Sequence, residues 1–191
     1  MDSKEYQKTS CHKLKQIFGN ENVKQEWDVG KSSQDSLTRE IYCPRLDIAV
    51  GPFNIDGRVE YNKQRIKDSI HRYSEFLRLI IDVSENGLHS KNNILTSLNR
   101  NPRCFFAIEI EASGSRKHML GDIANASILG AIGIVIPLTP SKLKGFTRIM
   151  KYIEFATAVG KLKSSFKNVL LINSDKFLEV LSHSDFLGML D

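Results

Sequence analysis

The chain has 191 residues, with 27 Lys and Arg against 22 Asp and Glu, so its formal net charge is +5. The hydrophobic fraction of 41% and the charged fraction of 26% are those of a globular protein, which argues against disordered and fibrous classes. No stretch approaches the ~18 consecutive apolar residues of a membrane helix, and the polar N-terminus does not resemble a signal peptide. We therefore expect no membrane partner. The three widely spaced cysteines favour a reduced, cytoplasmic protein.

The apolar pattern predicts one domain over residues 1–191. The expected elements in chain order are a helix over 2–18, strands over 22–29 and 40–50, a helical insertion over 55–101, a strand over 104–112, a helix over 116–129, a strand over 131–137, a helix over 141–159, a strand over 168–173 and a helix over 175–183. Within the insertion, apolar spacing predicts an amphipathic helix over 66–80 and a shorter helix around 94–98. A hairpin followed by strand–helix–strand units predicts an α/β fold with a mixed central β-sheet flanked by helices.

Strand alternation predicts which side chains share a face of the sheet. In the first strand, Val23, Gln25, Trp27 and Val29 are expected on one face. In the third strand, one face is expected to carry Phe105, Ala107, Glu109 and Glu111, and the other Phe106, Ile108 and Ile110.

The two glutamates of Glu109-Ile110-Glu111 are the most informative acidic residues of the chain. Their carboxylates are expected on one face, about 7 Å apart. Like charges this close repel each other unless a cation or a basic group lies between them. The pair therefore indicates either a cation site or an exposed strand end with two solvated acids.

Asp47 is unusual because it lies in the middle of an apolar strand. Aspartate is depleted in strands and is rarely buried without a partner. If this strand neighbours the third strand, Asp47 and Glu109 meet at one point and offer Mg²⁺ the carboxylate oxygens that it prefers. The alternative is a salt bridge from Asp47 to Arg45 or Arg103.

Asp47 followed by Glu109-Ile110-Glu111, with a helix and an apolar strand after them, resembles the PD-(D/E)xK nuclease superfamily. This superfamily includes type II restriction endonucleases, Holliday-junction resolvases and repair nucleases. Its core order of helix, three strands, helix and strand is similar to the order expected over 2–137, with 55–101 as an insertion. The resemblance implies a restriction-endonuclease-like core and a Mg²⁺-dependent DNA endonuclease, with Mn²⁺ as a substitute.

By the same resemblance, Asp47 and Glu109 would bind the metal together with the carbonyl of Ile110. Glu111 stands where the superfamily usually has lysine. Some restriction enzymes of the superfamily carry Glu-x-Glu and are active, with the last glutamate acting on the water or on the metal. Alternatively, Lys117 supplies the missing positive charge. As a further alternative, the site is inactive, and the protein binds nucleic acid or regulates a partner without cutting.

Basic residues are concentrated in 141–167, where seven Lys and Arg stand against one Glu. Such a cluster can neutralise DNA phosphates, or it can form a solvated face. The basic start of the helix over 116–129 can also contact a phosphate through its free amides. The residues that we expect to contact DNA are Arg116, Lys142, Lys144, Lys161 and Lys163.

Three further features of the sequence have more than one interpretation. Glu5 resembles the extra acid that many members of the superfamily carry on the first helix, or it is one charge on a surface helix. A homodimer is expected only if both strands of a duplex are cut. The helices of the insertion can alternatively serve as a scaffold for protein contacts.

Overall fold

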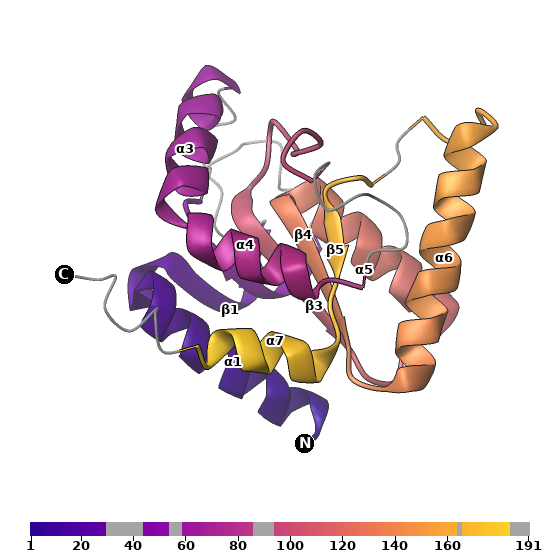
Figure 1. Cartoon of the computed structure of the whole chain (residues 1–191), viewed down its shortest axis with the longest axis horizontal. Helices are drawn as coiled ribbons and strands as arrows, with labels where there is room; N and C mark the ends of the chain where they lie inside the picture. The colour runs from indigo at the N-terminus through magenta and orange to yellow at the C-terminus, as the bar shows by residue number, and fades with distance from the viewer. Residues whose placement is uncertain (30–43, 54–58, 86–93, 164–165, 184–191) are drawn as a thin grey trace.

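The computed structural model describes residues 1–29, 44–53, 59–85, 94–163 and 166–183. The fold is α/β, with a five-stranded mixed sheet flanked by helices, which confirms the predicted fold class (Figure 1). The elements are α1 (Ser3–Phe18), the short 3₁₀ helix η1 (Asn20–Asn22), β1 (Val23–Asp28), β2 (Arg45–Val50), α3 (Val59–Arg72), α4 (Ser74–Val83), β3 (Cys104–Glu111), α5 (Arg116–Leu129), β4 (Gly130–Pro137), α6 (Pro140–Ala158), β5 (Val169–Leu171) and α7 (Ser174–Leu181).

The five strands lie side by side in sequence order, from β1 to β5. β2 is antiparallel to both β1 and β3, whereas β3, β4 and β5 are parallel. Because β2 runs against β3, the beginning of β2 lies beside the end of β3. Between β2 and β3 in the sequence, the described residues form the helices α3 and α4.

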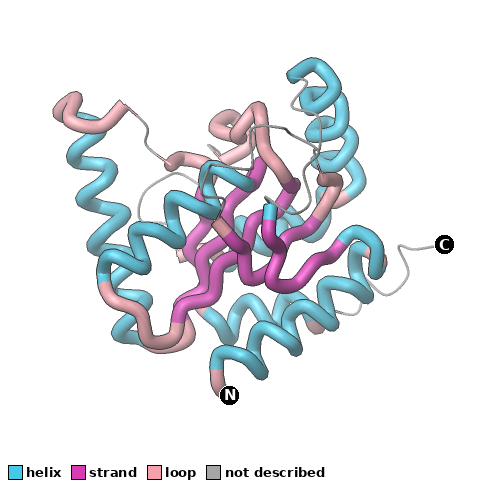
Figure 2. The backbone as a smooth tube through the Cα atoms, turned by 180° about the vertical axis from the view of Figure 1, so that it is seen from behind, coloured by secondary structure: helices cyan, strands magenta, loops and turns pink. Residues whose placement is uncertain are grey.

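Helices cover both faces of the sheet (Figure 2). One apolar cluster joins the sheet to α1, α4 and α7, through side chains such as Leu14, Phe76 and Phe177. The other cluster joins the opposite face to α5 and α6, through side chains such as Ile123 and Phe146. Each fully buried side chain of this size contributes about 1.5–3 kcal/mol to folding. The two clusters hold α1 and α5 against opposite faces of the sheet.

Side-chain caps determine where these helices begin. Asp2 accepts a backbone N–H at the start of α1, and Thr139 accepts one at the start of α6. At the start of α5, the N–H of Ser115 donates to the ring of His118 (3.0 Å). Such bonds satisfy donors that the first turn of a helix leaves without partners.

Two predictions within the insertion are wrong. The pattern over 66–80 belongs to two helices, because the chain leaves helical geometry at Tyr73. The Tyr73 ring packs edge-on against Phe18 and also contacts Phe105, so tertiary packing overrides local periodicity. Residues 94–98 form a turn and not a helix, and Ile94 alone of this stretch is buried in the core.

The predicted alternation also fails in β1. Val23 packs in the cluster with α1, whereas Trp27 and Val29 pack in the cluster with α5 and α6. Glu26 between them adopts φ +49°, a left-handed conformation that turns the following side chains to the other face. In β3, Phe105 also departs from the predicted alternation, since it packs in the same cluster as Phe106 and its ring contacts Tyr73.

Within the described residues, no helix is both long enough and apolar enough to cross a membrane. Cys11 and Cys104 are free and buried, while Cys43 and the expected strand residues before 44 lie outside the described residues. Burial raises the pKa of both described thiols, so they remain protonated and pack as small apolar groups.

Candidate active site

Three acidic residues lie in one row across the sheet. Glu26 lies opposite Asp47, between the paired residues Gln25–Ile48 and Trp27–Leu46 of β1 and β2. Extending the β2–β3 register by one position sets Asp47 opposite Glu109. The antiparallel pairing of β2 with β3 thus brings together two carboxylates that are 62 positions apart in the chain.

Asp47 and Glu109 are held by backbone donors at the point where β2 and β3 stop pairing. The N–H of Asp47 donates to Oε2 of Glu109 (3.3 Å), and Oδ2 of Asp47 accepts from the N–H of Ile110 (2.7 Å). At this end of the β2–β3 ladder, side-chain carboxylates therefore accept the backbone N–H groups in place of carbonyls. The N–H groups of Asp47 and Ile110 both keep an acceptor. Because backbone atoms orient both carboxylates, the pair is preorganised.

Glu111 is bound by the turn that follows β3. Its side chain is 8% exposed, and its carboxylate accepts a hydrogen bond from the N–H of Gly114. The ammonium of Lys142, on α6, donates to the carbonyl of the same glycine. A Cβ atom at position 114 would collide with the Glu111 carboxylate and with Cβ of His118, so a larger residue there would displace the Glu111 side chain. Since Glu109 is 6% exposed, the alternative of an exposed strand end with two solvated acids is wrong.

α5 contributes two polar residues that the sequence analysis missed. Asn125 donates from its side-chain amide to Oε1 of Glu109 (3.3 Å). Asp122 has a buried carboxylate oxygen, Oδ2, that lacks a hydrogen-bond partner. Both residues fall between the buried Met119 and Ala126, in the stretch of α5 that packs on the sheet. Polar residues at i and i+3 beside an apolar stripe were the signal that could have identified them.

α1 contributes Gln7, which is 6% exposed. Its amide donates to Oε1 of Glu26 (2.8 Å) and to the carbonyl of Asp47 (2.9 Å). Arg45 forms an ion pair with Oε2 of Glu26 (2.9 Å). Glu5, the candidate suggested by the family resemblance, is exposed on the same helix. The α1 residue that is hydrogen-bonded to the acidic row is therefore Gln7.

Burial and mutual repulsion raise the pKa of three carboxyl groups in this site. Burial raises the pKa of Asp47 to about 6, although the N–H of Ile110 acts to lower it. Burial, and then the charges of Asp47 and Asp122, raise the pKa of Glu109 to about 9. Burial, and then the charges of Glu111 and Asp47, raise the pKa of Asp122 to about 7. A bound cation would relieve this repulsion.

Lys117 lies apart from the carboxylate face of α5. It is exposed in the first turn, and with Arg116 and Leu120 it lines a groove between α5 and α6. Asp122 and Asn125, by contrast, lie in the half of α5 that approaches β3. A catalytic role for Lys117 stays a prediction, and Lys142 is the lysine that contacts the turn binding Glu111.

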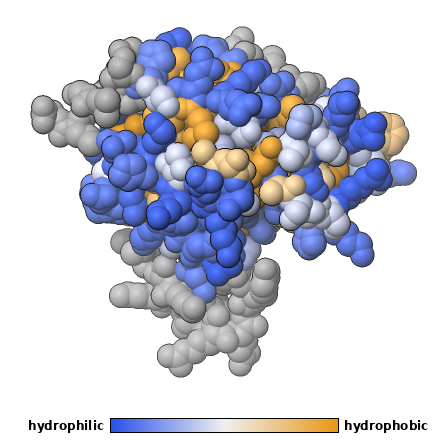
Figure 3. Space-filling view, turned by 90° about the horizontal axis from the view of Figure 1, so that it is seen from below, coloured by the Kyte–Doolittle hydropathy of each residue, from blue (hydrophilic) through white to orange (hydrophobic). Residues whose placement is uncertain are grey.

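The residues predicted to contact DNA are divided between the two ends of α6. Lys142 and Lys144 lie near its start, beside the turn that leads from β3 to Arg116. Lys161 and Lys163 follow its end, and this helix of 19 residues is about 28 Å long. Viewed from below, on the side of α1 and the start of α6, the surface is largely hydrophilic with small apolar patches (Figure 3). Of these four lysines, Lys142 is the one that contacts the turn binding Glu111.

The donor atoms around Asp47 and Glu109 are oxygens, which suits Mg²⁺ or Mn²⁺. Across the ranges that the structure describes, no group of three or more His, Cys, Asp and Glu side chains is arranged to hold a metal ion. Mg²⁺ usually takes one or two protein carboxylates and completes its shell with water and phosphate. The buried, unpartnered oxygen of Asp122 and the raised pKa values of Asp47 and Glu109 fit a cation bound in this way.

Comparison of the chain with models of protein families, with curated proteins and with solved structures finds no match. The structure has α1, β1, β2, β3, α5 and β4 in this order, with α3 and α4 between β2 and β3. Membership of the PD-(D/E)xK superfamily stays a prediction.

Proposed function

We propose that this protein is a metal-dependent DNA endonuclease with a restriction-endonuclease-like core. The observation that carries the proposal is the contact between Asp47 and Glu109 where β2 and β3 separate. Glu111 and Asp122 bring two further carboxylates to the same region, since the charge of Glu111 acts on Asp122 and that of Asp122 acts on Glu109. Buried acids with raised pKa values are typical of functional sites.

In this proposal, Asp47, Glu109 and the carbonyl of Ile110 bind Mg²⁺, which Mn²⁺ can replace. A bound Mg²⁺ polarises a phosphate oxygen and lowers the pKa of a water molecule. The carboxylates keep capacity for this ligand, because an ionised carboxylate has about four acceptor positions. Asp47 and Glu109 use only part of that capacity for hydrogen bonds with protein donors.

The residues around the carboxylates have separate roles in the proposed reaction. Glu111 orients the attacking water and accepts its proton. Lys142, bound to the same turn as Glu111, supplies positive charge near the phosphate in the transition state. Asn125 holds the orientation of Glu109 through its amide. Arg116 and Lys144 bind flanking phosphates of the DNA, and a homodimer would cut both strands of a duplex.

Cleavage of supercoiled plasmid DNA tests the proposal. We expect wild type to nick or linearise the plasmid with Mg²⁺ and to be inactive in EDTA. Glu109→Gln should lower the rate by about 100-fold or more, because an interaction with the transition state is lost. Glu179→Gln, which changes an exposed acid on α7, is the matched control and should remain active. Wild type that cleaves no DNA with Mg²⁺ or Mn²⁺ would contradict the enzyme and favour a nuclease-fold protein that only binds nucleic acid.

A further inference from the structure

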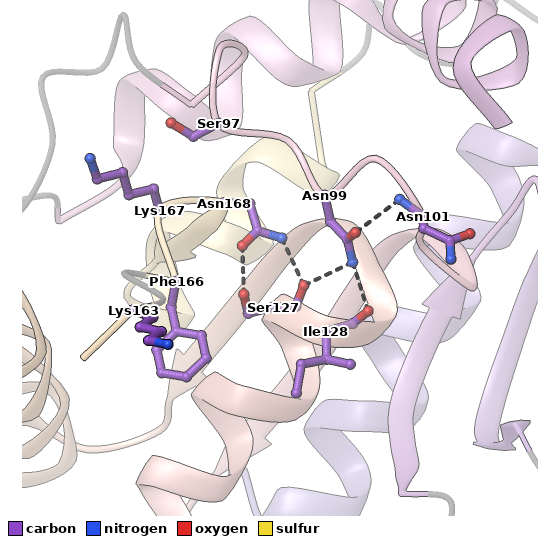
Figure 4. Close-up of a pocket in the computed structure, with 9 residues that line it drawn as sticks. All are labelled: Ser97, Asn99, Asn101, Ser127, Ile128, Lys163, Phe166, Lys167 and Asn168. Atoms are coloured by element: carbon purple, nitrogen blue, oxygen red, sulfur yellow. Dashed lines mark hydrogen bonds between the residues drawn. The ribbon is translucent and has the colours of Figure 1, made fainter. Parts of the chain in front are cut away.

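A separate pocket of about 580 Å³ lies at the opposite end of the sheet from the carboxylates (Figure 4). This volume is in the range of small-ligand sites, about 300–1,000 Å³. Its lining residue Asn168 binds Gly130 at the start of β4, whereas Glu111 pairs with Pro137 at the end of that strand. About 23 Å of strand separates the two regions. The pocket is therefore distinct from the candidate active site.

The floor of this pocket is a satisfied hydrogen-bond network. Asn168 is 4% exposed, and its amide donates to the carbonyls of Ser127 (2.9 Å), Gly130 (3.2 Å) and Ala131 (3.3 Å). The hydroxyl of Ser127 donates back to Oδ1 of Asn168 (2.6 Å). Asn99 donates to the carbonyl of Ser127 (3.2 Å) from the other side. Because these hydrogen bonds fix the side chains of the floor, binding does not have to order them.

The mouth of the pocket is cationic. Lys163 and Lys167 are exposed there, and Ser97 adds a polar side chain. No acidic side chain is among the described residues that line the pocket. Two ammonium groups with no carboxylate facing them across the pocket favour an anion, and phosphate is an anion that lysine binds well.

Phe166 forms an aromatic wall beside these lysines. Its φ of +46° lies in the left-handed region that bulky residues rarely adopt. Such conformations persist where the surroundings enforce them, and they occur often at ligand sites. Its carbonyl accepts the N–H of Val169 (3.2 Å), which ties the strained residue to the start of β5. Figure 4 shows the ring next to Lys163, at the side of the pocket.

We infer that this pocket binds a nucleotide unit, with the base against Phe166 and the phosphate at the cationic mouth, where Lys163 lies beside Phe166 and Lys167 on the side of Ser97 (Figure 4). Aromatic rings stack on bases of any sequence, and lysine neutralises the attached phosphate. A free nucleoside monophosphate and a single strand of nucleic acid both offer this chemistry. The inference is independent of the proposed endonuclease, because none of the four carboxylates lines the pocket.

Isothermal titration calorimetry in EDTA at low salt tests the inference with three probes: deoxyadenosine monophosphate, inorganic phosphate and single-stranded octadeoxyadenylate. The mononucleotide should bind saturably and more tightly than phosphate. Replacing Lys163 and Lys167 by Ala should lower the affinity for the mononucleotide by about tenfold or more. Phe166→Leu keeps an apolar side chain for packing but removes the ring. This variant should lower the affinity for the mononucleotide by about tenfold without changing the affinity for phosphate. Lys151→Ala, an exposed lysine of α6 outside the pocket, is the control.

The probes also separate the two sources of the ligand. If the mononucleotide binds as tightly as the octamer, the ligand of the pocket is a free nucleotide. If the octamer binds much more tightly than the mononucleotide, and the pocket variants abolish its binding, the ligand is a nucleic-acid strand. The inference is overturned if the pocket variants change neither affinity, or if phosphate binds as tightly as the mononucleotide and Phe166→Leu has no effect. Because EDTA removes divalent metal, failure of DNA cleavage does not affect these measurements.

Discussion

Glu111 and Lys142 bind the same turn from two sides. The Glu111 carboxylate accepts from the N–H of Gly114, and the Lys142 ammonium donates to the Gly114 carbonyl. The end of β3 and the start of α6 are joined through this one residue. Position 111 therefore requires a hydrogen-bond acceptor, which gives a physical reason for glutamate there.

We predict that Glu111→Lys destabilises the protein more than Glu111→Gln does. Glutamine keeps an oxygen for the Gly114 N–H, whereas lysine removes that acceptor and adds a second ammonium beside Lys142. The expected cost of Glu111→Lys is about 1–3 kcal/mol, because a half-buried donor is left unpaired. Urea unfolding at neutral pH measures this difference. Equal stability of the two variants would show that the Gly114 contact contributes nothing.

Variants of Glu111 also distinguish the proposed enzyme from a protein that only binds DNA. Glu111→Gln should abolish plasmid cleavage and spare DNA binding, because the lost interaction acts on the transition state. Cleavage assays and fluorescence anisotropy on the same samples measure both properties. If wild type, Glu111→Gln and Glu111→Lys all bind DNA and none cuts it with any divalent metal, the endonuclease proposal is wrong.

Metal binding should appear in thermal stability. We expect Mg²⁺ to raise the Tm of wild type by a few degrees, since a ligand that binds only the folded state stabilises it. Asp47→Asn should lose most of this response, because it removes a charged ligand oxygen and reduces the repulsion on Glu109. Glu179→Gln should respond like wild type. An equal response of Asp47→Asn and wild type would remove the case for a metal at this site.

The metal-free protein should lose stability as the pH rises. The pKa values of Asp47, Asp122 and Glu109 are raised in the folded state to about 6, 7 and 9, from the ordinary values of 3.8, 3.8 and 4.5. The folded state therefore binds more protons than the unfolded state, so the free energy of unfolding falls between about pH 4 and pH 9 and then levels off. Melting curves in EDTA across this range measure the slope.

Asp122→Asn provides the matched test of this pH dependence. It removes one buried charge and should stabilise the metal-free protein at pH 8 while changing little at pH 5, where Asp122 is already protonated. The slope of stability against pH should also become smaller. A wild-type protein whose Tm rises from pH 5 to pH 8 in EDTA would contradict the repulsion among these carboxylates.

DNA affinity should depend on salt through the basic residues at the starts of α5 and α6. Reversing Arg116 and Lys144 to Glu should weaken binding to every sequence and lower the slope of log K against log salt by about 0.9 per lost contact. Lys142 is left unchanged because it also contacts Gly114. Lys161→Glu, at the other end of α6, should have a smaller effect. An equal loss with Lys161→Glu would place the DNA along the whole helix.

The amino-acid sequence alone was sufficient for the fold class and for the approximate bounds of most elements. α5 covers Arg116–Leu129, as its apolar spacing and the cap at Ser115 predict. Periodicity and capping are properties of neighbouring residues, so a local pattern expresses them. The same local logic singled out Asp47, Glu109 and Glu111, because acids in apolar strands are conspicuous without any tertiary information.

Only the tertiary structure determined what surrounds those acids. Gln7, Asp122 and Lys142 reach the site from α1, α5 and α6, and their position depends on how each helix is rotated against the sheet. The left-handed conformation of Glu26 and the break at Tyr73 likewise follow from packing and hydrogen bonds between distant segments. Contacts of this kind compete with local preference by a few kcal/mol, and no spacing in the sequence records their outcome.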